Sequence, residues 1–140
     1  SAASDVYKRQ DVVIVAIGSL AMEAIVAADM LREAGHKVGV LGLRVFRPFP
    51  KGDVAKALKK SRLVVIFDKN ISYGLEGATC SEIKSALYGS SVNAVIRNFI
   101  VGLGGRDIKA RELVDAVNKS LLSMKEGGLN KEYPDWICDI

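Results

Sequence analysis

Cysteine, histidine and long apolar runs are scarce in this chain of 140 residues. It holds two cysteines, Cys80 and Cys138, and one histidine, His36. Iron–sulfur clusters and structural zinc sites need several thiolate or imidazole ligands, so both are excluded. No apolar run approaches the roughly 18–20 residues that a membrane-spanning helix needs. Two distant thiols are typical of a reduced, cytoplasmic setting, and a Cys80–Cys138 disulfide is a minor alternative.

Charge of one sign is not in large excess either. The net charge is +4, from 20 basic and 16 acidic residues, and apolar residues make up 49% of the chain. This composition and length are those of one ordinary soluble domain. The basic residues are scattered except for one cluster, which a solvated helix face explains better than a nucleic-acid site. That cluster is Lys56, Lys59, Lys60 and Arg62.

Apolar runs alternate with amphipathic segments along the chain. Four runs are typical of buried strands: residues 12–17, 37–43, 63–67 and 92–101. Arg97 and Asn98 interrupt the last run, which predicts a bend or two short strands. Apolar residues at helical spacing between and after these runs predict helices. Alternating strands and helices imply βαβ units, a mostly parallel sheet and helices on both faces.

Several residues mark where the predicted helices begin and end. Ser19 and Thr79 are expected to cap the helices that follow them, and Asp107 to cap the last helix. Gly35 is expected at positive φ just after the first helix, and His36 behind it is a loop histidine. The last helix, expected to end at Gly127, carries an apolar stripe. This stripe is Ala110, Leu113, Val114, Val117, Leu121 and Met124.

Two arginines and two prolines follow the strand predicted over residues 37–43. Pro48 and Pro50 restrict the backbone around Arg44 and Arg47. In open α/β sheets, ligands and partner domains usually lie at the carboxyl ends of the strands. A guanidinium suits carboxylates and phosphates alike. The two arginines are therefore predicted to contact acids on an adjoining domain or to bind an anionic ligand, and the rigid loop favours the interdomain contact.

Three stretches together resemble a known family. They are residues 38–50 (Val-Gly-Val-Leu-Gly-Leu-Arg-Val-Phe-Arg-Pro-Phe-Pro), 68–77 (Asp-Lys-Asn-Ile-Ser-Tyr-Gly-Leu-Glu-Gly) and 98–108 (Asn-Phe-Ile-Val-Gly-Leu-Gly-Gly-Arg-Asp-Ile). They are similar, in the family's order, to the alpha subunit of pyruvate:ferredoxin oxidoreductase and its 2-oxoacid:ferredoxin relatives. The match is to the second domain of that subunit, which resembles the carboxyl-terminal domain of transketolases. It implies a three-layer α/β/α sandwich with a mostly parallel sheet, and a piece of an enzyme.

For the parent enzyme, the resemblance implies oxidative cleavage of a 2-oxoacid, most simply pyruvate. The implied cofactors are thiamine diphosphate, magnesium, iron–sulfur clusters and coenzyme A, with ferredoxin as electron acceptor. This chain lacks the G-D-G…N-type signature that holds thiamine diphosphate through a metal. We therefore expect the cofactors on other domains, and neither a catalytic residue nor a metal site in this one. Its expected partners are those domains and subunits and, through the holoenzyme, ferredoxin.

Two further segments carry candidate contact residues. Residues 74–77 (Gly-Leu-Glu-Gly) suit a tight turn into a helix, with Glu76 near the helix start where negative charge is favourable. The resemblance places this edge toward the rest of the enzyme, so Tyr73 and Glu76 are equally candidates for interdomain contacts. Residues 102–107 (Gly-Leu-Gly-Gly-Arg-Asp) fit neither nucleotide fingerprint. They predict a structural turn that leaves Arg106 for an interdomain salt bridge or an anion.

The domain boundaries and two alternative functions complete the predictions. Residues 1–10 do not match the family and are interpreted as a non-native or linker segment, residues 11–126 as the domain, and residues 127–140 as a tail. One alternative is a free-standing doubly wound module that binds a small anion or nucleotide. Another is the matching domain of a transketolase-like protein or a 2-oxoacid dehydrogenase beta subunit, which residues 104–107 fit less well.

Overall fold

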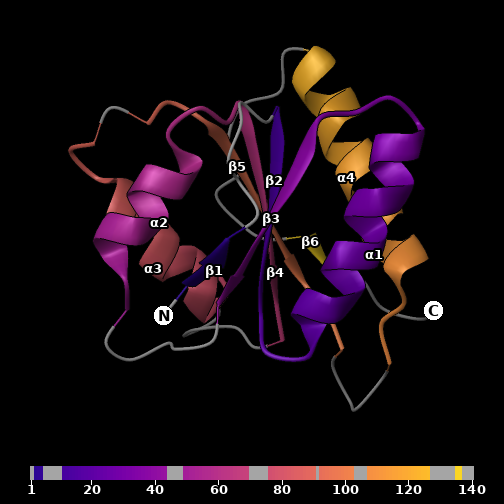
Figure 1. The fold of residues 1–140 in the computed structure, drawn as a ribbon, viewed down its shortest axis with the longest axis horizontal. Helices are drawn as coiled ribbons and strands as arrows, with labels where there is room; N and C mark the ends of the chain where they lie inside the picture. Colours follow the sequence, from indigo (N-terminus) through magenta and orange to yellow (C-terminus); the bar gives the residue numbers. More distant parts are fainter. Residues whose placement is uncertain are drawn as a thin grey trace.

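A central sheet with helices on both faces forms the described part of the protein (Figure 1). The computed structural model describes residues 2–4, 11–43, 49–69, 76–90, 92–102, 107–126 and 135–136. The strands are β1 (Ala2–Ser4), β2 (Val12–Ile17), β3 (Val38–Leu43), β4 (Leu63–Asp68), β5 (Val95–Ile100) and β6 (Asp135–Trp136). The helices are α1 (Leu20–Glu33), α2 (Lys51–Leu58), α3 (Ala78–Leu87) and α4 (Ala110–Lys125).

The sheet is mostly parallel, as expected for βαβ units. Its strand order is β1-β3-β2-β4-β5-β6. All neighbouring pairs are parallel except β1, which runs antiparallel along the edge of β3. Helices α1 and α4 cover one face and α2 and α3 the other, so the three-layer α/β/α sandwich is confirmed (Figure 1). Because β3 and β4 lie on opposite sides of β2, the strand order reverses at β2, and ligands of open α/β sheets bind at such reversal points.

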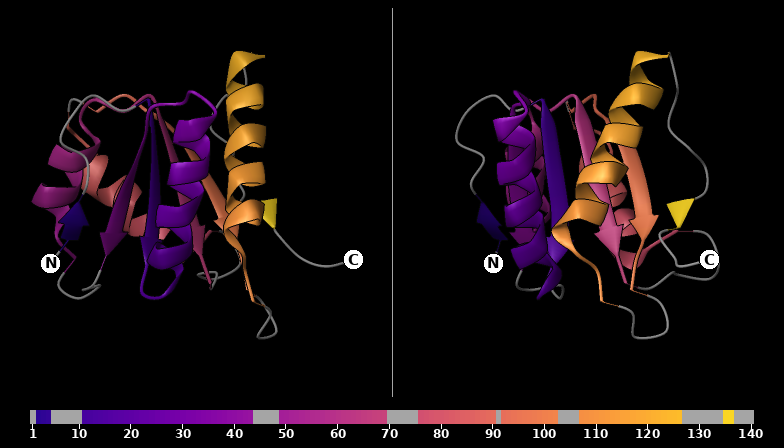
Figure 2. Two further views of the ribbon diagram at one scale, coloured as in Figure 1. Left: turned by 45° about the vertical axis from the view of Figure 1, so that its right-hand side comes forward. Right: turned by 90° about the vertical axis from the view of Figure 1, so that its right-hand side faces the viewer.

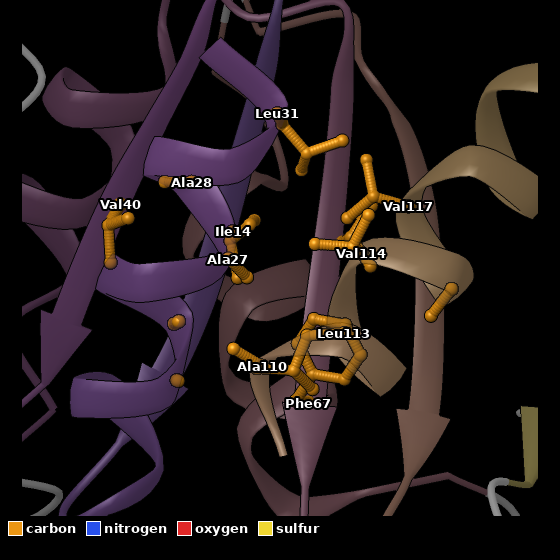
Figure 3. Packing of buried hydrophobic residues seen from close by; sticks show 14 of the residues in the cluster. Ile14, Ala27, Ala28, Leu31, Val40, Phe67, Ala110, Leu113, Val114 and Val117 are labelled. Atoms are coloured by element: carbon orange, nitrogen blue, oxygen red, sulfur yellow. The ribbon is translucent and has the colours of Figure 1, made fainter. Parts of the chain in front are cut away.

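The core has two halves, one on each face of the sheet. Successive strand residues point to opposite faces, so Ile14 packs toward α1 and α4 while Val13 and Val15 pack toward α2 and α3. Figure 3 shows the first half, where Leu31 of α1 and Val117 of α4 point at the sheet. Burial on both faces explains why the strands read as continuous apolar runs rather than as alternating ones.

The ends of α1 confirm one prediction and correct another. Gly35 has φ 96°, and its N–H donates to the carbonyl of Arg32 while His36 N–H donates to Leu31. These two bonds form a Schellman motif, as expected for a glycine after a helix. Ser19 does not cap α1: its φ of −62° and ψ of −25° are helical, and its side chain makes no capping bond, because that bond needs a more extended residue.

Strand β5 also differs from the prediction. It begins at Val95 rather than residue 92, and it is continuous through Arg97 and Asn98. Both polar side chains are buried and bonded: Arg97 Nη1 donates to Ser123 Oγ at 2.9 Å, and Asn98 bonds to β4. A buried polar side chain with partners costs little, so neither residue interrupts the strand.

The start of α4 is a further correction. The helix begins at Ala110, whereas Asp107 is exposed and lies three residues earlier. The N–H of Ala110 donates instead to Glu23 Oε2 on α1, at 3.0 Å. The apolar stripe of α4 is confirmed and packs in the first half of the core. The predicted end at Gly127 lies outside the described residues.

The two outer strands come from the ends of the sequence. Ala2–Ser4 pairs with Leu41–Leu43, and Asp135–Trp136 pairs with Phe99 and Ile100. Part of the segment interpreted as non-native and part of the tail thus lie along the sheet edges. Whether residues 1–10 belong to the native protein stays a prediction. None of the described helices is long and apolar enough to cross a membrane.

Candidate functional site

Four of the five predicted contact residues lie outside the described residues. These are Arg44, Arg47, Tyr73 and Arg106, and their roles stay predictions. The fifth, Glu76, lies just before α3. Strands β2 to β5 end at one edge of the sheet (Figure 2). At this carboxyl edge the structure shows two linked polar clusters, around Asp68 and around Glu76.

Asp68, the last residue of β4, is buried and caps α3. Its Oδ1 accepts the N–H of Thr79 at 2.9 Å, and its Oδ2 accepts the N–H of Cys80 at 3.2 Å. The first N–H groups of a helix have no partner within the helix, and the helix dipole favours negative charge there. Thr79 is therefore not the cap that was predicted: it lies inside the helix and receives its partner from β4.

Asn98 of β5 also bonds to the start of α3 and to the end of β4. Its Oδ1 accepts the N–H of Gly77 at 2.9 Å, and its Nδ2 donates to Asp68 Oδ2 and to the carbonyl of Ile66, both at 3.0 Å. Both ends of this amide are thus used. The carboxyl ends of two neighbouring strands together hold the first turn of α3.

Gly77 leaves the space that Asp68 occupies. A Cβ added at Gly77 would overlap the Cβ, Cγ and Oδ2 atoms of Asp68. The backbone of Gly77 is ordinary, with φ −67° and ψ 152°, so space rather than conformation requires glycine here. The last glycine of the Gly-Leu-Glu-Gly stretch is therefore a packing requirement of the Asp68 cluster.

Glu76 uses its carboxylate within the domain. It accepts hydrogen bonds from Ser81 Oγ at 2.8 Å, from Lys84 Nζ, and from Cys80 Sγ at 3.5 Å. Its side chain is 19% exposed. Burial by itself would raise the pKa of Glu76, but the bonds from Lys84 and Ser81 and the ammonium charge hold it below its usual value. This arrangement fits the predicted helix-start role, and an interdomain contact of Glu76 is not tested.

Burial and the contact with Glu76 also shift the pKa values of its partners Cys80 and Lys84. Burial and the charge of Glu76 raise the pKa of Cys80, so this free thiol stays protonated and unreactive. Burial alone would lower the pKa of Lys84, but its bond to Glu76 raises it overall. His36 lies at the other end of α1 and contributes nothing to this edge. Within the described residues, no three His, Cys, Asp or Glu side chains gather as a metal site.

Sequence reasoning identified Glu76 but missed Asp68, Asn98 and Gly77 as one cluster. The signals were present: an acid at the end of a strand, an amide inside the next apolar run, and a glycine before a helix. Sequence alone could not show that they meet, because this depends on the register between β4 and β5. That register places Ile66 opposite Asn98 and Asp68 opposite Ile100.

Comparison with known proteins gives consistent relatives. The family described as "Pyruvate:ferredoxin oxidoreductase core domain II" matches residues 10–113. Ketoisovalerate oxidoreductase subunit VorA of Pyrococcus furiosus is 37% identical over 122 residues, which are 87% of this chain and 31% of VorA. Pyruvate synthase subunit PorA of Methanosarcina barkeri is 40% identical over 118 residues, 84% of this chain and 29% of PorA. The chain thus spans about three tenths of these relatives.

Two solved structures share the fold. The 2-oxoglutarate:ferredoxin oxidoreductase from Magnetococcus marinus, solved with 2-oxoglutarate, coenzyme A and succinyl-CoA bound, has a TM-score of 0.65 and 18% identity. The matched region covers 86% of this chain and 20% of the oxidoreductase chain. A split gene transketolase has a TM-score of 0.64 and 22% identity. Its matched region covers 82% of this chain and 40% of the transketolase chain. These two structures confirm the transketolase-like fold. The family model and the sequence relatives confirm the predicted resemblance: the chain belongs to the pyruvate:ferredoxin oxidoreductase core domain II family, a domain of the 2-oxoacid:ferredoxin oxidoreductases.

Proposed function

We propose that this chain is the second domain of an alpha-type subunit of a 2-oxoacid:ferredoxin oxidoreductase and that it supports catalysis without performing chemistry. Its role is to present a rigid carboxyl edge against which the cofactor-bearing domains pack. Thiamine diphosphate, magnesium, iron–sulfur clusters and coenzyme A would be bound by those domains, and ferredoxin would be reduced by the complete assembly in the cytoplasm.

One observation carries the supporting role. Helix N-termini at the carboxyl edge of an α/β sheet are natural sites for phosphate and other anions. In this protein the N-terminus of α3 is occupied by the carboxylate of Asp68, and the first N–H of α4 is bonded to Glu23. At α3 and at α4, a carboxylate of the protein itself thus stands where the phosphate of a nucleotide would bind. This disfavours the alternative of a free-standing anion- or nucleotide-binding module.

The arrangement of titratable groups supports the same conclusion. A general acid or base must keep a hydrogen-bonding position for its substrate. Asp68 and Glu76 instead accept bonds from α3, and Cys80 is held as a neutral thiol. These contacts organise the edge rather than leave reactive groups on it.

For the substrate we propose pyruvate. Named relatives include subunits of pyruvate synthase and of ketoisovalerate oxidoreductase, at 40% and 37% identity. The family model that matches residues 10–113 is described for pyruvate:ferredoxin oxidoreductase, which puts pyruvate first and keeps ketoisovalerate as the second candidate. Both acids share the 2-oxoacid group that the oxidoreductase would cleave.

The test uses the complete assembly that carries this chain, purified with all its subunits. Ferredoxin reduction is followed with coenzyme A and one of three acids: pyruvate, ketoisovalerate or 2-oxoglutarate. We expect the highest kcat/KM with pyruvate. A higher kcat/KM with ketoisovalerate would reassign the substrate, and no reduction with any 2-oxoacid would refute the proposed function.

A further inference from the structure

The outward face of α1 carries apolar side chains into solvent. Met22, Ile25 and Val26 are 68%, 46% and 49% exposed. Their i, i+3, i+4 spacing puts them on one stripe of the helix. The opposite stripe is buried in the core and consists of Leu20, Ala24, Ala27, Ala28 and Leu31. Helix α1 is thus apolar on both sides over its first two turns.

The other helices do not share this property. Exposed positions of α2 include Lys51, Asp53 and Lys56, and those of α4 include Arg111 and Asp115. Two more large apolar residues are exposed in the described part of the chain, Tyr88 and Leu122, and each stands alone on a different helix or at its end. Neighbouring apolar side chains in water are typical of an interaction surface, whereas single ones are ordinary.

The surroundings of the stripe are those of a small interface. Asp29 follows Ile25 by four residues on the same outward side and pairs with Arg32 at 3.1 Å. An apolar centre with a charged rim is the usual composition of a contact between folded units. The stripe begins one turn from Gly18 and Ser19, which are exposed at the carboxyl edge of the sheet. It is therefore continuous with the edge to which we assign domain packing.

We infer that Met22, Ile25 and Val26 pack against an apolar surface on the part of the same subunit that lies outside this domain. The inference rests on the proposed function, because the chain spans only about three tenths of its relatives' subunits. Stable interfaces between separate proteins bury roughly 1,200–2,000 Å² and involve about 20–30 residues on each side, whereas this stripe consists of three residues. Domains joined by a linker have a high effective concentration, so a small apolar contact is enough to dock them.

A cross-linking experiment in the complete assembly tests the occupant directly. Met22 is replaced by the photo-reactive residue p-benzoylphenylalanine, and Leu122 by the same residue in a control. After irradiation, mass spectrometry identifies the linked peptides. We expect position 22 to link to peptides of the same subunit outside residues 1–140, and position 122 to give no such link. A link from position 22 to another subunit or to a second copy, or no link, would overturn the inference.

A thermal measurement provides independent evidence. M22Q/I25Q is expected to lower the Tm of the complete assembly, whereas L122Q, which removes one isolated apolar side chain, leaves it unchanged. In the 140-residue chain alone, both variants should keep the Tm of the parent. Equal effects of the two variants in the assembly would contradict the inference. Neither readout requires activity, so an assembly that reduces ferredoxin without the cross-link refutes only the α1 contact, and one that shows the cross-link without 2-oxoacid activity refutes only the proposed function.

Discussion

Asp68 is the residue on which the start of α3 depends most. Its carboxylate is buried, and its three donors are neutral: the N–H groups of Thr79 and Cys80 and the amide of Asn98. A buried charge is tolerated only when hydrogen bonds replace its water, so each of these groups constrains the others. The residue that shows this constraint best is Gly77, because it has no side chain of its own to lose.

Gly77→Ala is expected to destabilise the domain by about 1–3 kcal/mol, as other overpacking changes do, because its Cβ would overlap the side chain of Asp68. Urea denaturation of the 140-residue chain measures this loss. Gly52→Ala in α2 is the control, since its Cβ meets nothing within 4 Å and alanine favours a helix by up to about 1 kcal/mol. If both variants unfold at the same urea concentration, Gly77 does not have the role assigned to it.

The bond between Glu76 and Lys84 predicts a dependence of stability on pH. The folded state holds the pKa of Glu76 below its usual value of 4.5, so Glu76 stabilises the fold above that pH and loses its effect as the pH falls through the folded pKa. The pKa of Lys84 is raised in the folded state, so the stabilisation from this pair is lost again at alkaline pH, when Lys84 loses its proton. Glu76→Gln is therefore expected to lower the free energy of unfolding at pH 7, by up to about 1 kcal/mol for a partly exposed pair.

Urea denaturation of Glu76→Gln and of the parent at several pH values measures this effect. The difference between the two proteins should shrink as the pH is lowered below 4.5. Glu33→Gln removes an exposed acid from α1 and serves as the control, with little effect at either pH. A difference for Glu76→Gln that is the same at pH 7 and in acid would show that its charge does not matter.

At the scale of the elements, two helices begin on carboxylates from elsewhere in the chain. Asp68 of β4 accepts a backbone N–H of α3, which joins α3 to the sheet. Glu23 of α1 accepts the first N–H of α4, which joins the two helices of one layer. Helices α1 and α4 lie side by side on one face (Figure 1). The bond from Ala110 to Glu23 thus fixes their relative position as well as the start of α4.

Glu23→Ala is expected to cost about 1 kcal/mol, as the loss of a helix cap does, and to speed amide hydrogen exchange in the first turn of α4. Glu23→Gln keeps an acceptor and should cost less. Asp115→Ala is the control, because its carboxylate lies 3.7 Å from Arg111 Nε and both side chains are exposed. A loss of stability for Asp115→Ala as large as that for Glu23→Ala would argue against the capping role of Glu23.

Deletion of the segment that contains β1 would test the predicted N-terminal boundary of the domain. Its three residues pair with the edge of β3, and an edge contact of this length adds little to a domain with a two-sided core. Deletion of residues 1–10 is therefore expected to change the free energy of unfolding by less than about 1 kcal/mol, near the range of surface changes. Thermal and urea unfolding of the shortened chain measure this change, and a greater loss would show that the segment is part of the fold.

At the scale of the whole molecule, the proposed function depends on the hydrogen-bonded carboxyl edge of the sheet. The parallel strands end there, and Asp68, Asn98 and Gly77 join β4, β5 and α3 at one point. An edge organised in this way can present a defined surface to another domain without itself binding a cofactor. The proposed function therefore makes a direct prediction for the isolated chain.

The 140-residue chain alone is expected not to bind thiamine diphosphate. Isothermal titration calorimetry with magnesium and the cofactor should give no binding heat, whereas the complete assembly under the same conditions should give a saturable signal. The chain lacks the G-D-G…N-type signature for this cofactor, and the described N-termini of α3 and α4 are already bonded to Asp68 and Glu23. A micromolar dissociation constant for the isolated chain would refute its supporting role.

The sequence by itself determined the fold class and most of the elements. The apolar run over Val12–Ile17 predicted β2 with its observed bounds, Gly35 predicted the end of α1, and the stripe from Ala110 to Met124 predicted the buried face of α4. These features depend on local periodicity and on the backbone preferences of single residues. Both can be read from neighbouring positions in the chain.

Only the tertiary structure decided which polar groups cap the helices and that β5 is continuous. Asp68 and Thr79 are 11 residues apart, Gly77 and Asn98 are 21 apart, and Glu23 and Ala110 are 87 apart. The local candidates, Ser19, Thr79 and Asp107, do not cap their helices. A hydrogen bond goes to whichever partner the sheet register and helix packing bring within about 3 Å, and between distant residues that choice is made only when the layers come together.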